Sequence, residues 1–240
     1  MTLNEYIKSK KDIELSNSQK EAINKISDFL KSDTHCFILK GFAGTGKTFI
    51  IALIKEYLDS IDYQTLIYTP TGRAAKVVAD KIKSPHVAMT IHRGIYSFHE
   101  FKNRMKDLNK EIKKLELKQK EEPLHITEKN QLRNLNIEKR DLKKVLKEIE
   151  VYGKGTFQLS INKDKMNSIY FVDEASMLSN KESSGRNKNV DIKFGNERFV
   201  TDLISYVDLR NALSRKIIFV GDSSQLTPVN MNYSPALSAE

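Results

Sequence analysis

The residues with the strongest chemical signal form the run Gly41-Phe42-Ala43-Gly44-Thr45-Gly46-Lys47-Thr48. A run of this kind turns successive backbone N–H groups towards a phosphate, and glycine is needed where a Cβ would block the approach. The lysine then reaches the β and γ phosphates of a nucleoside triphosphate, and the threonine hydroxyl binds Mg²⁺. A helix that begins here also directs its positive end at the anion. The run therefore predicts a binding site for a nucleoside triphosphate with Mg²⁺.

A pair of carboxylates, Asp173 and Glu174, directly follows the apolar run 169–172. A carboxylate at the end of a strand beside the phosphate loop is placed to hold the Mg²⁺ shell, and an adjacent glutamate can orient and deprotonate the attacking water. We therefore assign Asp173 to the metal and Glu174 to the base. The alternative interpretation is that both residues only cap the helix that follows.

A second polar segment, 221–229, follows the apolar run 217–220 and contains Gln225. This glutamine could contact the γ-phosphate or position a water molecule. Taken alone, the segment is equally typical of a surface loop.

These residues need parallel strands to bring them together, and the hydrophobic pattern supplies candidates. Short apolar runs at 36–39, 65–68, 169–172 and 217–220 are typical of buried strands. Between them, amphipathic patterns predict helices at 49–58, 72–83 and 199–213. This alternation predicts an α/β fold with a doubly wound parallel sheet. The segment 181–198, rich in Ser, Gly and charge, is expected to be a surface loop.

Residues 98–150 depart from this alternation. Apolar residues recur there at intervals of three and four, in two series separated by Pro123: Phe98, Phe101, Met105, Leu108, Ile112 and Leu115, then Leu132, Leu135, Leu142, Leu146 and Ile149, with Lys139 at one position of the second series. This pattern predicts an antiparallel helical hairpin about 33 Å long, in which each narrow apolar face buries the other. The segment holds 15 Lys and Arg against 11 Asp and Glu. It is either a solvated arm or an arm that contacts nucleic acid or a partner protein.

Composition sets broad limits. The 240 residues, 39% hydrophobic, are enough for one large or two small globular domains. The net charge of +9 favours a polyanionic partner. The single cysteine, Cys36, cannot form an internal disulfide, and no apolar run is long enough to span a membrane. We therefore expect a cytoplasmic protein with no membrane contact.

Six segments in order resemble the successive motifs of superfamily 1 DNA helicases, most closely the RecD-like and Dda-like branch. They are 15–19, 41–48, 69–75, 90–93, 173–177 and 221–229. The resemblance implies a P-loop NTPase with a RecA-like parallel sheet flanked by helices and an inserted helical hairpin. It further implies ATP and Mg²⁺ as cofactors, translocation on single-stranded DNA in the 5′ to 3′ direction, and a setting in DNA repair or recombination.

The resemblance also implies roles for single residues. Gln19 is similar to the glutamine that contacts adenine, and Gln225 to the one that links the γ-phosphate to the DNA track. Contacts to the DNA backbone are implied for Pro70, Thr71, Arg73, Thr90 and His92. From the residues alone, a turn or capping role is as good an interpretation of the two threonines and the histidine, and Arg73 could simply solvate a helix N-terminus.

Family members carry a second RecA-like domain whose arginines reach the γ-phosphate, and no such domain fits between Val229 and Glu240. We therefore expect an N-terminal motor domain, 1–97 and 151–240, interrupted by the hairpin at 98–150. Alone, it is expected to bind nucleotide without unwinding DNA. The alternatives are a non-enzymatic, nucleotide-switched DNA-binding module and the motor subunit of a helicase-nuclease complex. The hairpin's length and its lack of a central aromatic also put strand separation by this arm in doubt.

Overall fold

The computed structural model describes residues 2–10, 13–83, 87–97, 99–152, 155–181, 192–195, 198–228 and 231–238. Internal contacts divide the chain into two units. Unit 1 comprises 1–95, 161–182 and 197–240, and unit 2 comprises 96–160 and 183–196. The domain boundaries at residues 98 and 150 stay a prediction.

Unit 1 holds most of the expected α/β elements. In chain order these are α1 Leu3–Ser9, α2 Asn17–Lys31, β1 Cys36–Lys40, α3 Lys47–Ser60, β2 Gln64–Thr69, α4 Gly72–Ile82, β3 Ala88–Thr90, α5 Ile91–Ile95, β6 Ser168–Val172, η1 Ala175–Met177, α8 Phe199–Val207, β8 Lys216–Gly221 and η2 Pro235–Leu237. Both η segments are single 3₁₀ turns.

The five strands of unit 1 form one sheet in the order β1-β8-β6-β2-β3. All four pairings are parallel, with Lys40 opposite Gly221 and Thr69 opposite Thr90. The predicted parallel α/β sheet is confirmed. Because the strands are parallel, the loops that follow β1, β8 and β6 leave the sheet at one edge, next to the loops that follow β2 and β3.

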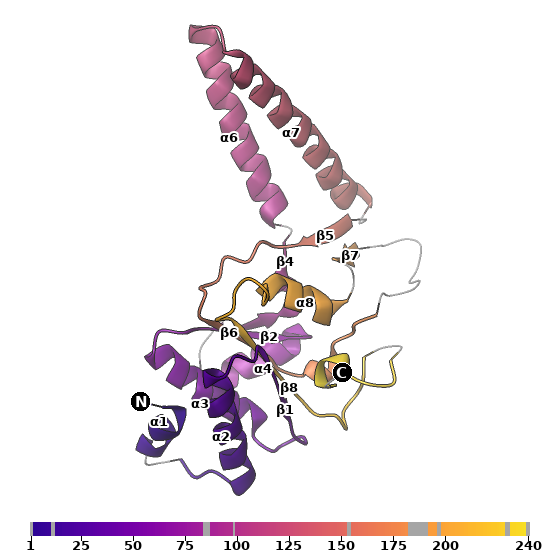
Figure 1. Cartoon of the computed structure of the whole chain (residues 1–240). Coiled ribbons are helices and arrows are strands. Elements are labelled where there is room, and N and C mark those ends of the chain that lie inside the picture. Colours follow the sequence, from indigo (N-terminus) through magenta and orange to yellow (C-terminus); the bar gives the residue numbers. More distant parts are fainter. Residues whose placement is uncertain are drawn as a thin grey trace. The chain divides into compact units, whose positions relative to one another are not determined.

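The central strands β6 and β8 are covered on both faces, which explains why their apolar residues form continuous runs rather than an alternating pattern. Every residue of β6 and β8 is buried. Ile169 and Phe171 belong to the core formed with α1, α2 and α3. The intervening Tyr170 instead packs edge-on against Tyr206 of α8, with ring centroids 6.5 Å apart. Figure 1 shows α8 on one side of the sheet and α2 and α3 on the other.

Two local predictions were wrong. The helix expected at 199–213 ends at Val207, because Asp208 adopts a left-handed conformation and its N–H closes the last turn on Ile204 and Ser205. The apolar spacing beyond it belongs to turns. Within the segment expected to be a loop, Ile192–Phe194 forms a strand, β7. Residues 182–191 of that segment lie outside the described part of the chain.

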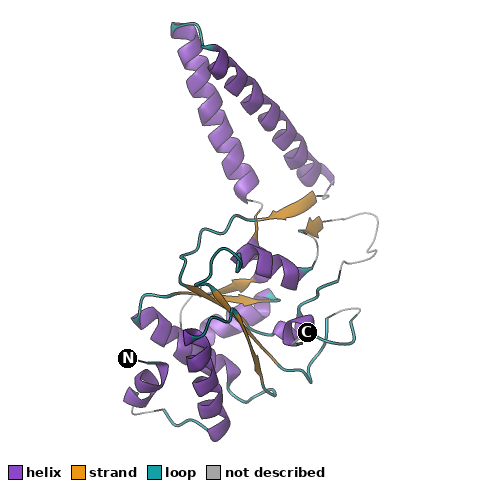
Figure 2. Cartoon of the chain, viewed as in Figure 1, coloured by secondary structure: helices purple, strands orange, loops and turns teal. Residues whose placement is uncertain are grey.

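Unit 2 combines a helical hairpin with a small sheet (Figure 2). Helix α6 spans His99–Glu121 and α7 spans Ile126–Tyr152. Strand β5, Gly155–Leu159, pairs antiparallel with β4, Tyr96–Ser97, and parallel with β7. The rings of Phe157 and Phe194 stack at 4.8 Å between centroids, which ties β7 to this sheet.

The apolar seam of the hairpin is closed where its side chains are described. Leu108, Ile112 and Leu135 are buried, with Leu115 and Leu132 packed against them. Phe98 lies outside the described residues, and so do the side chains of Phe101, Leu142, Leu146 and Ile149. No helix in the described part of the chain is long and apolar enough to cross a bilayer.

A glycine in α5 makes a close contact in unit 1 that can be tested. A Cβ at Gly94 would lie 2.3 Å from the Tyr68 ring, which is buried and packed against Tyr170. Because the ring has little room to move, we expect Gly94→Ala to lower the free energy of unfolding by about 1–3 kcal/mol, measured by urea denaturation.

Gly72→Ala is the matched control for this substitution. A Cβ at Gly72, the first residue of α4, meets nothing within 4 Å. Its stability should therefore equal or slightly exceed that of the wild type. A Gly94→Ala protein as stable as the Gly72→Ala protein would contradict the packing argument.

Candidate nucleotide-binding site

The loop between β1 and α3 has the backbone of a phosphate cradle. Gly44 and Gly46 have φ angles of +79° and +86°, which side-chain-bearing residues rarely adopt. A Cβ at Gly41 would lie 2.9 Å from Thr45 Oγ1, and one at Gly46 would lie 2.6 Å from Gln19 Nε2. The backbone conformation therefore favours glycine at Gly44 and Gly46, and a Cβ at Gly41 or Gly46 would displace the side chain of Thr45 or Gln19.

Gln19 holds this loop from α2. Its side-chain oxygen accepts a hydrogen bond from Ser16 N at 3.0 Å, and Ser16 Oγ accepts one from Gln19 N at 3.3 Å, so the two residues form a capping box. Gln19 Nε2 donates to the Thr45 carbonyl at 3.1 Å. The start of α2 thus fixes the amide of Gln19 against the phosphate loop.

The remaining polar groups of the loop are also oriented. Lys47 Nζ donates to the carbonyls of Gly41 at 2.6 Å and Phe42 at 2.9 Å, and Thr45 Oγ1 donates to the Phe42 carbonyl at 2.8 Å. The loop is anchored to the neighbouring strand as well, because Gly41 N donates to the Gly221 carbonyl at 3.1 Å. Lys47 is therefore held inside the loop at the start of α3.

The two predicted carboxylates lie beside the loop. Asp173 Oδ2 accepts a hydrogen bond from Thr48 Oγ1 at 3.4 Å, and Asp173 Oδ1 accepts one from Glu174 N at 3.0 Å. Glu174 has a left-handed φ of +54°. The other described non-glycine residues with positive φ, Asp62, Lys83 and Asp208, follow the ends of α-helices. Among these four residues, Glu174 alone lies beside the phosphate loop and Asp173. Backbone strain at such a polar cluster is typical of functional sites.

The pKa values of both carboxyl groups are raised above their ordinary values. Burial raises the pKa of Asp173, although the Glu174 N–H, the Thr48 hydroxyl and the Lys47 charge oppose the shift. Burial, and then the negative charge of Asp173, raise the pKa of Glu174, while Lys47 and Lys81 lower it. A raised pKa makes Glu174 a better proton acceptor, as general-base catalysis requires.

These groups line one pocket of about 420 Å³. Its walls are formed by Ala43, Gly44, Gly46, Lys47, Thr48, Phe49, Ala52, Lys81, Asp173, Glu174 and Gln225. The loop offers a cradle that Cβ atoms would fill, and hydroxyl and carboxylate oxygens are the ligands that Mg²⁺ prefers. The residues present therefore fit a magnesium nucleoside triphosphate. Among the described residues, no cluster of three or more His, Cys, Asp or Glu side chains forms a separate metal site.

Sequence reasoning missed Lys81, in the last turn of α4, because nothing in its local pattern links it to the loop. It lines the pocket, and its charge lowers the pKa of both Asp173 and Glu174.

We expect Lys81→Ala to weaken ATP binding about 3- to 10-fold, measured by calorimetry, because an exposed cation contributes on the order of 1 kcal/mol. Lys76→Ala, an exposed lysine of the same helix, is the control; equal affinities for both variants would exclude the role of Lys81.

The residues expected to contact DNA lie at the ends of two adjacent strands, β2 and β3, and in the first turns of the helices that follow them. Pro70, Thr71 and Arg73 follow β2, and Thr90 ends β3 opposite Thr69. Both threonines cap helices: Thr71 Oγ1 accepts from Ala74 N and Thr90 Oγ1 accepts from Arg93 N, each at 3.2 Å. The structure thus shows the capping role that the residues alone left open, and each hydroxyl keeps its own proton to donate.

His92 is half-buried in α5, where its ring packs edge-on against Phe199 at 4.6 Å between centroids. Burial lowers the pKa of this ring. A lowered pKa means that the folded state disfavours the charged ring. The stability that the neutral ring contributes is therefore present above about pH 6.5, the ordinary histidine value, and is lost as the pH falls.

We expect His92→Gln to reduce the loss of stability between about pH 7.5 and pH 5.5, since glutamine does not titrate. Urea midpoints at both pH values check this. His125→Gln, a substitution of an exposed ring in unit 2, serves as the control and should retain the wild-type pH dependence. Identical pH profiles for His92→Gln and the wild type would contradict the prediction.

Comparison with known proteins decides the family. A family profile described as an AAA domain, AAA_30, matches residues 14–185. The chain belongs to this family. It is a P-loop NTPase with a RecA-like fold, and its motifs are those of RecD-like superfamily 1 helicases. The resemblance inferred from the six motifs is confirmed.

Two curated proteins and a solved structure also match this chain, which spans only part of each of them. An uncharacterised protein of Acanthamoeba polyphaga mimivirus is 29% identical over 216 residues, which cover 88% of this chain and 33% of that protein. An uncharacterised protein of Methanocaldococcus jannaschii is 46% identical over 68 residues, or 28% of this chain and 6% of that protein. The crystal structure of Pif1 helicase from Candida albicans aligns over 94% of this chain and 37% of its own, at 18% identity and a TM-score of 0.41. The chain thus spans at most about a third of these curated relatives.

Proposed function

We propose that this chain is the ATP-binding motor domain of a DNA helicase that couples ATP hydrolysis to movement along single-stranded DNA. In this proposal Lys47 holds the β and γ phosphates, Thr48 and Asp173 hold Mg²⁺, and Glu174 activates the attacking water. Gln225 senses the γ-phosphate, and Gln19 contacts the adenine. Movement 5′ to 3′ rests on the family resemblance.

One observation supports the proposed coupling between nucleotide binding and DNA binding. The nucleotide pocket is formed by residues that follow β1, β8 and β6, and the candidate DNA residues follow β2 and β3, the next strands in the same sheet. The residues proposed to bind nucleotide and those proposed to contact DNA therefore follow neighbouring strands at the same end of one sheet. A displacement of one loop can be passed to the next strand end without crossing the core.

The test is a titration of a fluorescent oligothymidylate with the protein, followed by anisotropy. We expect weak binding that falls with salt and that changes at least about 3-fold between ADP·Mg and a non-hydrolysable ATP analogue. The same affinity in all nucleotide states would overturn the proposed coupling.

A DNA-stimulated ATPase assay of the whole protein distinguishes a motor from a non-enzymatic binding module. Hydrolysis that rises on addition of single-stranded DNA supports a motor, in which arginines from a second RecA-like domain would complete the site. Nucleotide-dependent DNA binding without hydrolysis would identify a nucleotide-switched binding module instead.

A further inference from the structure

The outer face of α6, opposite its apolar seam, carries a straight row of lysines. The positions 106, 110, 113, 117 and 120 recur at intervals of four and three, the same spacing as the seam, and therefore form one stripe. Lysine occupies all of these positions except Leu117, and Lys106, Lys110, Lys113 and Lys120 are exposed. We call these four residues the α6 lysine ridge.

Charge on α6 is segregated, which is unusual for a face that only needs to be solvated. Between Lys106 and Lys120 no acidic residue occupies the ridge stripe; Asp107, Glu111 and Glu116 lie on the flanks. Among the described side chains, one ridge lysine forms an ion pair: Lys110 Nζ lies 4.0 Å from Asp107 Oδ1. The two side chains are 82% and 58% exposed. A contact of this kind contributes little in water.

The ridge therefore brings like charges together. Lys106 and Lys110 are neighbours at i,i+4, and Lys110 and Lys113 at i,i+3, and like charges at these spacings destabilise a helix. An external polyanion would relieve this repulsion. The ridge is about 21 Å long at a rise of about 1.5 Å per residue, which matches about six base pairs of duplex DNA.

We infer that the α6 lysine ridge binds the phosphate backbone of duplex DNA. The arm lacks the feature that single-strand binders mostly use, because no Phe, Tyr or Trp occurs between Phe101 and Tyr152 on which a base could stack. A regularly spaced row of point charges on a helix instead suits the regularly spaced phosphates of a duplex, which it contacts without sequence preference.

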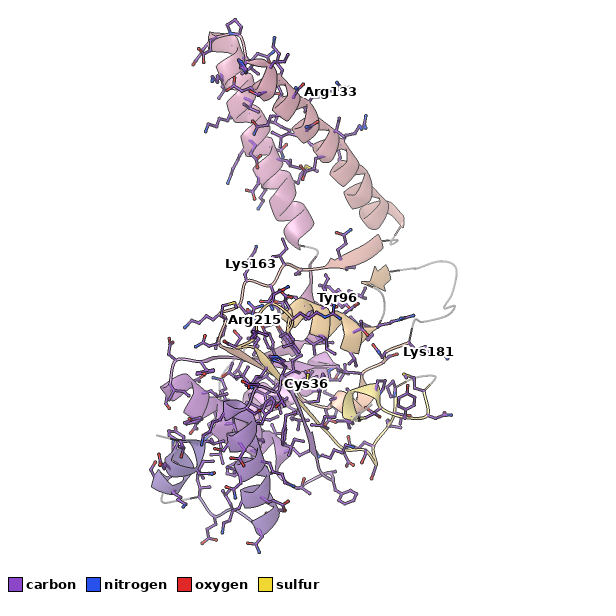
Figure 3. The ribbon with its side chains drawn as sticks, viewed as in Figure 1. Cys36, Tyr96, Arg133, Lys163, Lys181 and Arg215 are labelled. Atoms are coloured by element: carbon purple, nitrogen blue, oxygen red, sulfur yellow. The ribbon has the colours of Figure 1, made fainter. Side chains whose placement is uncertain are left out.

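Helix α7 has a second basic edge, but a less continuous one. Lys129, Arg133 and Arg140 are exposed, and Arg133 lies on the outer side of α7 in Figure 3. The exposed apolar residues Ile126 and Ile137 interrupt this edge. We therefore assign the duplex contact to α6.

The experiment compares matched triple variants of the whole chain. In one, Lys106, Lys110 and Lys113 are changed to Gln; in the other, the exposed Lys8, Lys25 and Lys31 of α1 and α2 are changed to Gln. Both lose the same net charge. The binding of a fluorescent DNA duplex of about 20 base pairs is measured across a salt series.

The ridge variant should bind the duplex about 10- to 100-fold more weakly, and its slope of log affinity against log salt should fall by about 2–3, near 0.9 for each lost phosphate contact. The control variant should keep the wild-type slope, and both variants should bind oligothymidylate as the wild type does. Equal loss of duplex affinity in both variants, or none in the ridge variant, overturns the inference. Unchanged ATP binding by both variants shows that the nucleotide site is unaffected, so this outcome is independent of the proposed motor function.

Discussion

Lys47→Ala should remove nucleotide binding while leaving the fold intact. Lys47 is the cation held within the phosphate loop, where its ammonium bonds to the Gly41 and Phe42 carbonyls. Charge-assisted hydrogen bonds contribute about 1.5–3 kcal/mol each, so losing two from a bound triphosphate corresponds to about a 100-fold or greater loss of affinity. Calorimetry with ATP·Mg measures this loss directly.

Lys40→Ala provides the control for this variant. Lys40 is exposed at the end of β1, directly before the loop, and does not line the pocket. The two variants should unfold at similar urea concentrations, and only Lys47→Ala should fail to bind. Unchanged ATP affinity in Lys47→Ala would exclude the loop as the nucleotide site.

Glu174→Gln should separate binding from hydrolysis. Glutamine keeps the size of the side chain and the N–H that donates to Asp173, but it cannot accept a proton from water. We expect nucleotide affinity within about 3-fold of the wild type and a hydrolysis rate about 10²- to 10⁴-fold lower, because general-base catalysis contributes that factor. Phosphate release from the full-length product in the presence of single-stranded DNA gives the rate.

Glu21→Gln, on the exposed side of α2, should hydrolyse ATP at the wild-type rate. If Glu174→Gln also kept that rate, Glu174 would not be the base, and its left-handed backbone would need another explanation. A parallel loss of affinity and rate would instead indicate that Glu174 helps to bind the nucleotide.

Four of the five strands of unit 1 were predictable because each is a continuous apolar run, whereas the three-residue β3 was not predicted. Four continuous apolar runs marked β1, β2, β6 and β8, and the structure extends each by one or two residues at most. The three-residue β7 could not be found, because so short a strand has no periodicity and depends on the stacking of Phe194 on Phe157, which is distant in sequence. The helix at 199–213 was predicted too long because Leu213 continues the apolar spacing, but this side chain is 67% exposed and lies in a turn beyond the left-handed Asp208.

The candidate site was predictable where residue type alone implies chemistry. Gly46 and Lys47 identify a phosphate loop, and the strand-end position of Asp173 brings it to the same edge. Their placement in one pocket is observed, whereas their catalytic roles stay a prediction. Lys81 could not be found, because its place in the pocket depends on how α4 packs rather than on any local signal.

The hydrogen bond from Gly41 N to the Gly221 carbonyl joins two loops that leave the sheet side by side. On one side of this bond begins the phosphate loop. On the other begins the turn that carries Gln225, which is stiffened by hydrogen bonds from Ser224 N to Asp222 Oδ1 and from Gln225 N to the Asp222 carbonyl. The two loops are thus tied together by one backbone hydrogen bond. A shift of the glutamine turn that stretched this bond would also move the start of the phosphate loop, which would link the roles proposed for Lys47 and Gln225 mechanically.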